Sequence, residues 1–209
     1  MHKRATTLPF AAALTMIGGY LDAYSYAVRG KVFANAQTGN IVLFARAVAE
    51  RNPASMLHYF IPILTFVVGV YLAKTIDHHF AETSHHTHLV LAIEATLAII
   101  CAFVPHHRDN LANLMLSFLC AIQVATFGEF RAIPITTTMC TGNLKNATDL
   151  LHRYHAKGET ESKKPSLVIY AFVALFALGA TVGFLLSSIL ETRAVLLPAF
   201  VLILLALLA

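Results

Sequence analysis

Two acidic residues and a repeated tripeptide are the features of this sequence that could do chemistry. Asp22 and Glu94 each lie inside an apolar stretch, and Thr-Gly-Asn occurs at residues 38–40 and again at 141–143. A carboxyl group at membrane depth costs about 2.5–3.5 kcal/mol on insertion scales, so it is expected to face the protein interior and to have a partner. Each acid is therefore a candidate site residue, with a structural ion pair or a protonated, hydrogen-bonded acid as the alternative.

The composition indicates that these residues lie within a membrane protein. The 209 residues are 57% hydrophobic and 12% charged, with a mean hydropathy of +0.68. Soluble chains carry about 25% charged residues, so this chain could not cover a water-facing surface of its size. The net charge of +4 comes from Lys and Arg scattered between apolar stretches, a pattern that orients membrane spans and does not indicate nucleic-acid binding.

Six stretches approach the roughly 20 apolar residues that a transmembrane helix needs. They are Leu8–Val28, Leu57–Ile76, Leu89–Val104, Leu111–Phe127, Leu167–Leu190 and Ala194–Ala209. The sequence therefore predicts an all-α polytopic membrane protein, with residues 1–209 forming a single membrane domain. The three cysteines lie in or beside apolar runs, which indicates small core residues and no disulfide.

The two halves of the chain resemble each other. The second Thr-Gly-Asn follows the first by 103 residues (142 − 39), and an apolar stretch precedes each copy at the same offset. Phe66-Val67-Val68-Gly69 then matches Phe176-Ala177-Leu178-Gly179 at an offset of 110 (179 − 69). We expect two pseudo-repeats, approximately residues 8–104 and 111–209.

The segments around the tripeptides, Val32–Ala49 and Pro134–Leu151, carry too many polar residues to face lipid along their length. We expect short or broken helices buried between the six spans. If these segments do not cross the membrane, the halves are inverted; if they do cross, there are eight spans and the halves are parallel. The distribution of Lys and Arg favours a cytoplasmic N-terminus in both cases.

The candidate site follows from this arrangement. Thr38 and Thr141 are expected to cap helices that begin at the following glycine, so that two positive helix ends point into one cavity near the repeat interface. Arg46 is the expected counterion of Asp22, and Asn40 and Asn143 are expected to lie close together. The predicted cavity residues are Asp22, Asn35, Gln37, Thr38, Gly39, Asn40, Arg46, Thr141, Gly142 and Asn143, with Glu94 and Gln123 as secondary candidates.

Two other patterns favour structural interpretations. Gly69-xxx-Ala73 and Gly179-xxx-Gly183 are small-xxx-small patterns, which serve helix contacts within one chain or a homo-oligomer interface that would include Gly69, Gly179 and Gly183. The eleven histidines fall at or beyond the ends of the apolar stretches. We therefore expect no bound metal and no cofactor, although residues 78–88 have the composition of a loop zinc site.

The block Gly19-Tyr20-Leu21-Asp22-Ala23, followed by Val32-Phe33-Ala34-Asn35-Ala36-Gln37-Thr38-Gly39-Asn40, resembles the YoaK family of bacterial integral membrane proteins. The resemblance implies six spans, a place in the bacterial cytoplasmic membrane, and importance for Asp22 and the Thr-Gly-Asn block. The biochemical function of that family is unassigned, so the resemblance supplies no substrate.

We therefore expect a transporter or channel for a small solute, with proton coupling through Asp22 as a further expectation. A membrane-embedded enzyme or lipid-handling protein is an alternative, although HExxH and GxSxG are absent from the sequence, and a non-transporting oligomeric scaffold is another. The expected partners are the lipid bilayer, the solute and a second copy of the chain. The N-terminus, residues 77–88, residues 156–165 and the C-terminus are expected on the cytoplasmic side.

Overall fold

The computed structural model describes residues 7–80, 86–127, 135, 137 and 140–208, and this part of the chain is helical throughout. Its eight α-helices are α1 (Leu8–Val28), α2 (Gln37–Ala49), α3 (Pro53–Phe80), α4 (His86–Ala102), α5 (Asp109–Thr126), α6 (Cys140–Lys157), α7 (Lys163–Leu190) and α8 (Leu196–Leu208). Short 3-10 turns lie at His106–Arg108, Thr160–Ser162 and Glu191–Val195 (η3). The prediction of an all-α fold is confirmed.

Each of the six predicted apolar stretches corresponds to one helix, although α8 has only 13 residues. The first coincides with α1, whereas α3 extends the second predicted span at both ends, from Pro53 to Phe80. The two tripeptide segments form α2, of 13 residues, and α6, of 18 residues. Helix α6 continues to Lys157 and so takes up the start of the predicted 156–165 loop.

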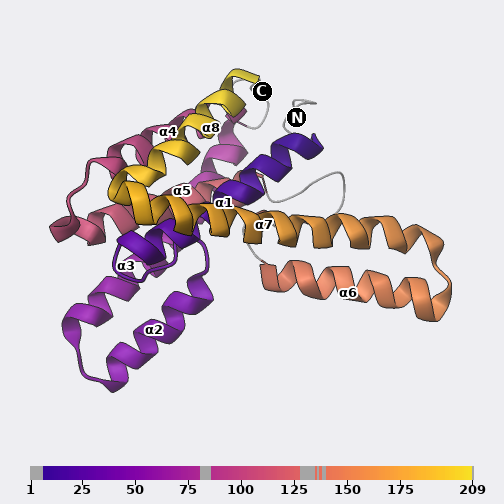
Figure 1. Cartoon of the computed structure of the whole chain (residues 1–209), viewed down its shortest axis with the longest axis horizontal. Helices are drawn as coiled ribbons and strands as arrows, with labels where there is room; N and C mark the ends of the chain where they lie inside the picture. The colour runs from indigo at the N-terminus through magenta and orange to yellow at the C-terminus, as the bar shows by residue number, and fades with distance from the viewer. Residues whose placement is uncertain (1–6, 81–85, 128–134, 136, 138–139, 209) are drawn as a thin grey trace.

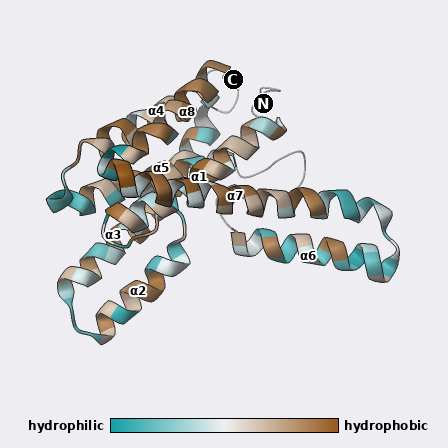
Figure 2. Cartoon of the chain, in the orientation of Figure 1, coloured by the Kyte–Doolittle hydropathy of each residue, from teal (hydrophilic) through white to brown (hydrophobic). Residues whose placement is uncertain are grey.

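The outside of the bundle is apolar. Tyr71, Ile189 and Leu207 are each more than 70% exposed, and Figure 2 shows hydrophobic colouring along α4, α7 and α8. By length and hydropathy, two helical stretches can cross a membrane, Pro53–Asp77 and Thr160–Leu208, the second of which contains α7 and α8. A water-facing surface of this kind would be unfavourable, so the helices indicate a membrane protein.

Helices α1 and α7 pack side by side and run in the same direction. Gly179 lies against the backbone of Met16, and Gly183 lies one turn further along α7 against Tyr20, one turn further along α1. A Cβ atom on Gly183 would lie 2.7 Å from the carbonyl oxygen of Tyr20. These two glycines are buried within the chain and allow the two helix backbones to approach closely.

Helices α3 and α5 form a second pair that also runs in one direction. His58 Nδ1 lies 2.6 Å from Asn110 Oδ1 near the start of both helices, and Lys74 Nζ donates to the carbonyl oxygen of Ala125 (2.7 Å) further along both. Between these contacts, Gly69 packs against Ala121. All three glycines of the predicted small-residue patterns therefore contact helices of their own chain, and a homo-oligomer through them stays a prediction.

Helix α1 of the first pair contacts α5 of the second pair, and these two helices run in opposite directions. Gln123 Nε2 near the end of α5 donates to the carbonyl oxygen of Leu14 (3.1 Å), whereas Asn113 Nδ2 near its start donates to that of Arg29 (2.9 Å), just after α1 ends. Helices α1 and α5 are therefore antiparallel. Helices α4 and α8 are antiparallel as well, because His88 at the start of α4 contacts Ala206 near the end of α8, while η3, which precedes α8, also packs on α4.

Two hairpins project from the bundle. Figure 1 shows α2 beside the first part of α3, and α6 beside the first part of α7. Their tips are hydrophilic in Figure 2. In the second tip, the Arg153 guanidinium donates to Glu159 and holds the pKa of that carboxyl group below its usual value. The two tips are therefore the parts of the hairpins best suited to water.

Candidate functional site

A pocket of about 440 Å³ opens where α1, α7 and the first turns of α2 and α6 meet. Its polar lining consists of Asp22, Asn35, Gln37, Thr38, Cys140, Thr141 and Gly142. Its apolar lining consists of Ala23, Phe33, Ala36, Phe176, Ala180 and Phe184. The volume is that of a small-molecule site, and an apolar lining with a few converging polar groups is the usual composition of such sites.

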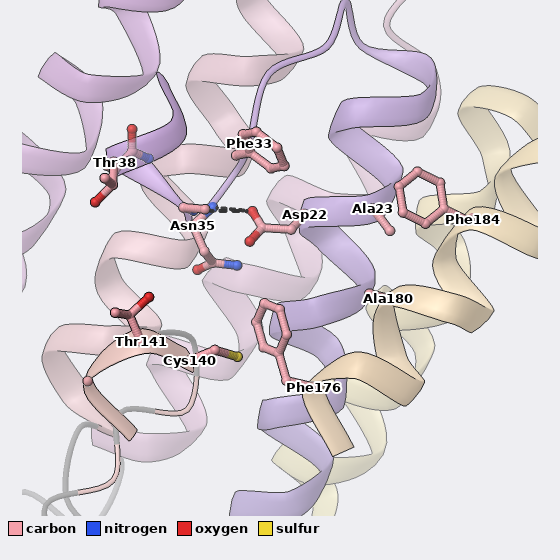
Figure 3. A pocket seen from close by; sticks show the side chains of 13 residues that line it. Asp22, Ala23, Phe33, Asn35, Thr38, Cys140, Thr141, Phe176, Ala180 and Phe184 are labelled. Carbon is pink, nitrogen blue, oxygen red and sulfur yellow. Dashed lines mark hydrogen bonds between the residues drawn. The ribbon is translucent and has the colours of Figure 1, made fainter. Parts of the chain in front are cut away.

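Asp22 anchors the loop that leads into α2. Its Oδ1 atom accepts hydrogen bonds from the backbone N–H groups of Asn35 (2.7 Å) and Ala36 (3.3 Å), as Figure 3 shows for Asn35. Within the described residues, the Oδ2 atom accepts no hydrogen bond. Asp22 is only 6% exposed and lines the pocket, so a ligand in the pocket can meet this second oxygen.

The side chain of Asn35 adds a second connection between this loop and α1. Its Nδ2 atom donates to the carbonyl oxygen of Gly18 (3.0 Å), and the backbone N–H of Ala34 donates to Ser25 Oγ (3.1 Å). Asn35 and Ser25 are both buried. The loop is therefore held at several points, which keeps Asp22 and the start of α2 in fixed relative positions.

Asn40 fixes the start of α2 from the other side. Its Oδ1 atom accepts from the backbone N–H of Phe33 (2.9 Å), and its Nδ2 atom donates to the Phe33 carbonyl oxygen (2.7 Å). Gly39 packs beneath the same residue, since a Cβ atom there would lie 2.8 Å from the Phe33 ring. The Gly-Asn pair of the first tripeptide therefore holds the Phe33 ring in the pocket wall.

The prediction that the threonines cap these helices is wrong. Helix α2 begins at Gln37 and α6 at Cys140, so Thr38 and Thr141 lie in the first turn and not before it. No side chain caps α2, whose preceding residue is Ala36. The Asp22 carboxylate lies just before α2 and accepts the N–H groups of Asn35 and Ala36, the two residues that precede the helix.

The two helix starts do meet at one pocket. Thr38 and Thr141 both line it, and so do Gln37 and Cys140, which are also 103 residues apart (140 − 37). Figure 3 shows Thr38 on one side and Cys140 with Thr141 on another, around the space beside Asp22. Two partial positive charges from helix ends and one carboxyl group therefore border the same space.

Arg46 is not the counterion of Asp22. Its Nε atom lies 2.8 Å from Glu50 Oε1, one turn further along α2, and its side chain is 68% exposed. An exposed pair four residues apart is the ordinary arrangement on a helix surface. The predicted Asp22–Arg46 pair fails because Arg46 lies more than two turns into α2, away from the helix start that borders the pocket.

The other predicted residues are not among those that line the pocket. Asn40 and Asn143 are buried, and their expected closeness stays a prediction. Gln123 is used in the α1–α5 contact described above. Glu94 is fully buried in α4, and the thiol of Cys120 lies within electrostatic range of both Glu94 and Asp22.

The aromatic wall of the pocket is absent from the sequence prediction. Phe176, Ala180 and Phe184 follow each other at intervals of four residues along α7, which is also the pattern of any helix packed in a bundle. Phe33 is stacked on Tyr26 with 4.9 Å between ring centroids, and Tyr26 meets Phe184 edge-on at 6.4 Å. The position of Phe33 next to the Thr-Gly-Asn block could have indicated a role for this residue. Nothing in the sequence distinguishes Phe176 from the other phenylalanines.

No metal site is apparent in the part of the chain that the structure describes, since no group of three or more His, Cys, Asp or Glu side chains there could hold an ion. The histidine-rich segment that we considered for zinc lies partly outside the described residues. The chemistry available in the pocket is therefore that of one carboxyl group, amide and hydroxyl groups, a thiol and aromatic rings.

Comparison with known proteins gives one result. The model of a family described as a protein of unknown function, DUF1275, matches residues 10–208, nearly the whole chain. This match confirms the resemblance to the YoaK family at the level of the family. No curated protein and no solved structure matches the chain significantly.

Proposed function

Because the chain belongs to the DUF1275 family, whose function is unknown, we propose its function from the pocket itself: a transporter or channel for a small solute in the bacterial cytoplasmic membrane. The observation that carries this proposal is the meeting of two short-helix starts, one from each half of the chain, at a pocket that Asp22 borders. Sites of this kind, built from broken helices at the interface of two repeats, are typical of membrane transporters.

The directions of the helices support two inverted repeats. In the alignment of the halves, α1 corresponds to α5, α3 to α7 and α4 to α8. Parallel halves with eight spans would give corresponding helices the same direction, whereas α1 and α5 are antiparallel, as are α4 and α8. A single pseudo-twofold rotation then places α1 on α5 and α7 on α3, so the α1–α7 contact corresponds to the α5–α3 contact. Six spans with two intervening half-helices account for all of these directions.

The length and composition of α2 and α6 support the same topology. Helix α2 has 13 residues and so is about 20 Å long, shorter than a hydrocarbon layer of about 30 Å. Helix α8 has the same length, but it continues the apolar helical stretch that contains α7. Helix α6 carries Lys145, Asp149 and Arg153 along an exposed face, which lipid would not accommodate. Both helices therefore act as half-helices whose starts border the pocket and whose ends lead outward to the hydrophilic tips.

Asp22 is the group through which a proton would couple to solute movement. It is the carboxyl group in the pocket lining, and its free Oδ2 atom can carry a proton or meet a solute. Among the described residues, the thiols of Cys120 from α5 and Cys140 from α6 lie within electrostatic range of Asp22, and Cys120 also lies within range of Glu94. A proton and a cationic or hydrogen-bond-donating solute would compete for the same oxygen.

Reconstituted vesicles provide the test. Purified protein in sealed liposomes should speed the entry of one or more small solutes from a panel of neutral, cationic and anionic compounds, measured by light scattering after an osmotic step, with and without a pH gradient. Asp22→Asn should abolish the pH dependence. Asp149→Asn, the same change on the exposed face of α6, should preserve it.

Two results would contradict the proposal. If well-folded wild-type protein moves none of the solutes faster than empty liposomes do, the transport function is wrong. If Asp22→Asn retains both its flux and its dependence on pH, Asp22 is structural and proton coupling is wrong. Size-exclusion chromatography and the thermal midpoint in detergent establish that each variant is folded.

A further inference from the structure

The pocket combines a carboxyl group with aromatic walls. The described residues that line it include one acid, Asp22, and three phenylalanines, and no Lys, Arg or His. Figure 3 shows the rings of Phe33 and Phe176 on either side of the Asp22 carboxyl group. Carboxylate and aromatic faces are the two groups that attract an organic ammonium ion, the first through its charge and the second through the ring quadrupole.

We propose that this pocket binds a small organic cation, a protonated or quaternary amine, with the ammonium group at Asp22 and the alkyl groups against the phenylalanines. The proposal rests on the transport function proposed above and specifies the class of its solute. A volume of about 440 Å³ suits a solute of this size, since ligand sites run from about 300 Å³ upward.

The hydrogen bonds of Asp22 leave a place for this cation. Its Oδ1 atom is used by the N–H groups of Asn35 and Ala36, which hold the carboxyl group in one orientation, while Oδ2 accepts no hydrogen bond within the described residues. A buried carboxylate with an unpaired oxygen is costly, and an ammonium ion would remove that cost. Ion pairing and desolvation would therefore both favour a cation over a neutral solute.

The same hydrogen bonds weaken the case for an anion. Helix starts attract anions, and two of them border this pocket. At α2, however, the N–H groups of Asn35 and Ala36 already face the Asp22 carboxylate, so that positive end is compensated within the protein. An anion would have to bind at the start of α6 alone, with a carboxylate facing it across the pocket.

The other half of the molecule has an ammonium group at the corresponding position. By the offsets of the two halves, Lys74 corresponds to Phe184 (184 − 74 = 110) and Ala125 corresponds to Asp22 (125 − 22 = 103). Lys74 Nζ donates to the Ala125 carbonyl oxygen at 2.7 Å. Lys74 Nζ also lies 3.7 Å from Asp77 Oδ2. At these two corresponding positions the other pair of helices therefore has a lysine and an alanine, whereas the pocket has Phe184 and the acid Asp22.

The aromatic group beside the pocket already attracts one cation. Lys31 Nζ lies 4.8 Å from the centre of the Tyr26 ring, and Tyr26 is the residue that stacks on Phe33 and meets Phe184. This distance is within the range of about 6 Å over which a cation and a ring attract each other. Lys31 lies outside the lining of the pocket, so its ammonium group does not occupy the proposed site.

Matched probes on the purified, detergent-solubilised chain test the proposal. Choline, tetramethylammonium and methylammonium are the cations; 3,3-dimethylbutan-1-ol, which has the shape of choline with carbon in place of nitrogen, is the neutral control; and acetate is the anion. We expect at least one cation to raise the thermal midpoint and to bind saturably by calorimetry. The neutral alcohol should bind at least about ten-fold more weakly than choline.

Variants then assign the binding to the pocket. Asp22→Asn should remove the effect of the cations, while Phe176→Leu should weaken cation affinity about ten-fold. Asp149→Asn and Phe103→Leu, the same changes at exposed positions away from the pocket, should bind like wild type. Phe176→Leu also serves if Asp22→Asn does not fold, because Phe176 is only partly buried and makes none of the loop hydrogen bonds.

Three results would overturn the proposal: equal binding of choline and its neutral analogue, stabilisation by acetate and not by the cations, or no binding of any of the three cations. Failure here is distinguishable from failure of the transport function. Flux of neutral or anionic solutes without cation binding would leave a transporter of another specificity. Saturable cation binding without flux of any solute would leave a cation-binding membrane protein that does not transport.

Discussion

The two buried carboxyl groups show that the surroundings of a side chain determine whether it can serve a binding site. Asp22 and Glu94 are equivalent in sequence terms, each a single acid in an apolar stretch. In the structure Asp22 accepts backbone N–H groups and borders a pocket, whereas Glu94 is fully buried and neither of its oxygens has a hydrogen-bond partner within the described residues. The surroundings of Asp22 are those of a binding site, whereas those of Glu94 lower the stability of the protein.

Replacing Glu94 with leucine should therefore stabilise the protein. An unsatisfied buried polar group costs about 1–3 kcal/mol, and leucine is close to glutamate in size. We expect Glu94→Leu to raise the thermal midpoint in detergent and to leave cation binding at the Asp22 pocket unchanged. A lower midpoint would mean that Glu94 has a partner, such as an ordered water, that stabilises it.

At this scale the sequence predicted the acid and the polar residues of the first tripeptide, because polar groups within apolar segments are conspicuous. It did not predict the partner of Asp22. Charge alone pointed to Arg46, whereas the carboxylate is satisfied by backbone N–H groups of residues 35 and 36, which every residue except proline possesses. The sequence therefore does not show which backbone N–H groups bind a side chain.

At the scale of elements, the small residues decide how closely the helices approach. A Cβ atom on Gly179 would collide with the backbone of Met16 in α1, while one on Gly142, at the start of α6, would meet no described residue within 4 Å. The sequence predicted close packing from the Gly-xxx-Gly spacing, but it could not tell which helix would be the neighbour. The same residue type thus has opposite roles at two positions.

Alanine at these two glycines should have effects of opposite sign. Gly179→Ala must push α1 and α7 apart and should destabilise the protein by about 1–3 kcal/mol, the usual cost of overpacking. Gly142→Ala should stabilise it by up to about 1 kcal/mol, because alanine favours the helix and fills open space. Thermal midpoints of the two purified variants, compared with wild type, give the answer; a tolerated Gly179→Ala would show that the α1–α7 contact is looser than the structure has it.

At the scale of the whole molecule, hydropathy predicted the helices and the tripeptide repeat predicted two related halves, but neither gave their relative orientation. Charge counting favours a cytoplasmic N-terminus for both six and eight spans, since the polar segments can be assigned either way. The antiparallel direction of α1 and α5 comes from contacts between residues far apart in the sequence, such as Gln123 with Leu14 and Asn113 with Arg29. Only the packed structure contains that information.

The two hairpin tips should therefore lie on opposite sides of the membrane. With α1 and α5 antiparallel, the tip between α2 and α3 is expected outside the cell and the tip between α6 and α7 inside. Ala54 and Ala156 are exposed positions at these tips, so Ala54→Cys and Ala156→Cys, in a background without Cys101, Cys120 and Cys140, form a matched pair. An impermeant thiol reagent applied to intact cells should label Ala54→Cys, and it should label Ala156→Cys only after the membrane is broken. Labelling of both variants from the same side would favour eight spans with parallel halves, since α2 and α6 would then each cross the membrane in the same direction.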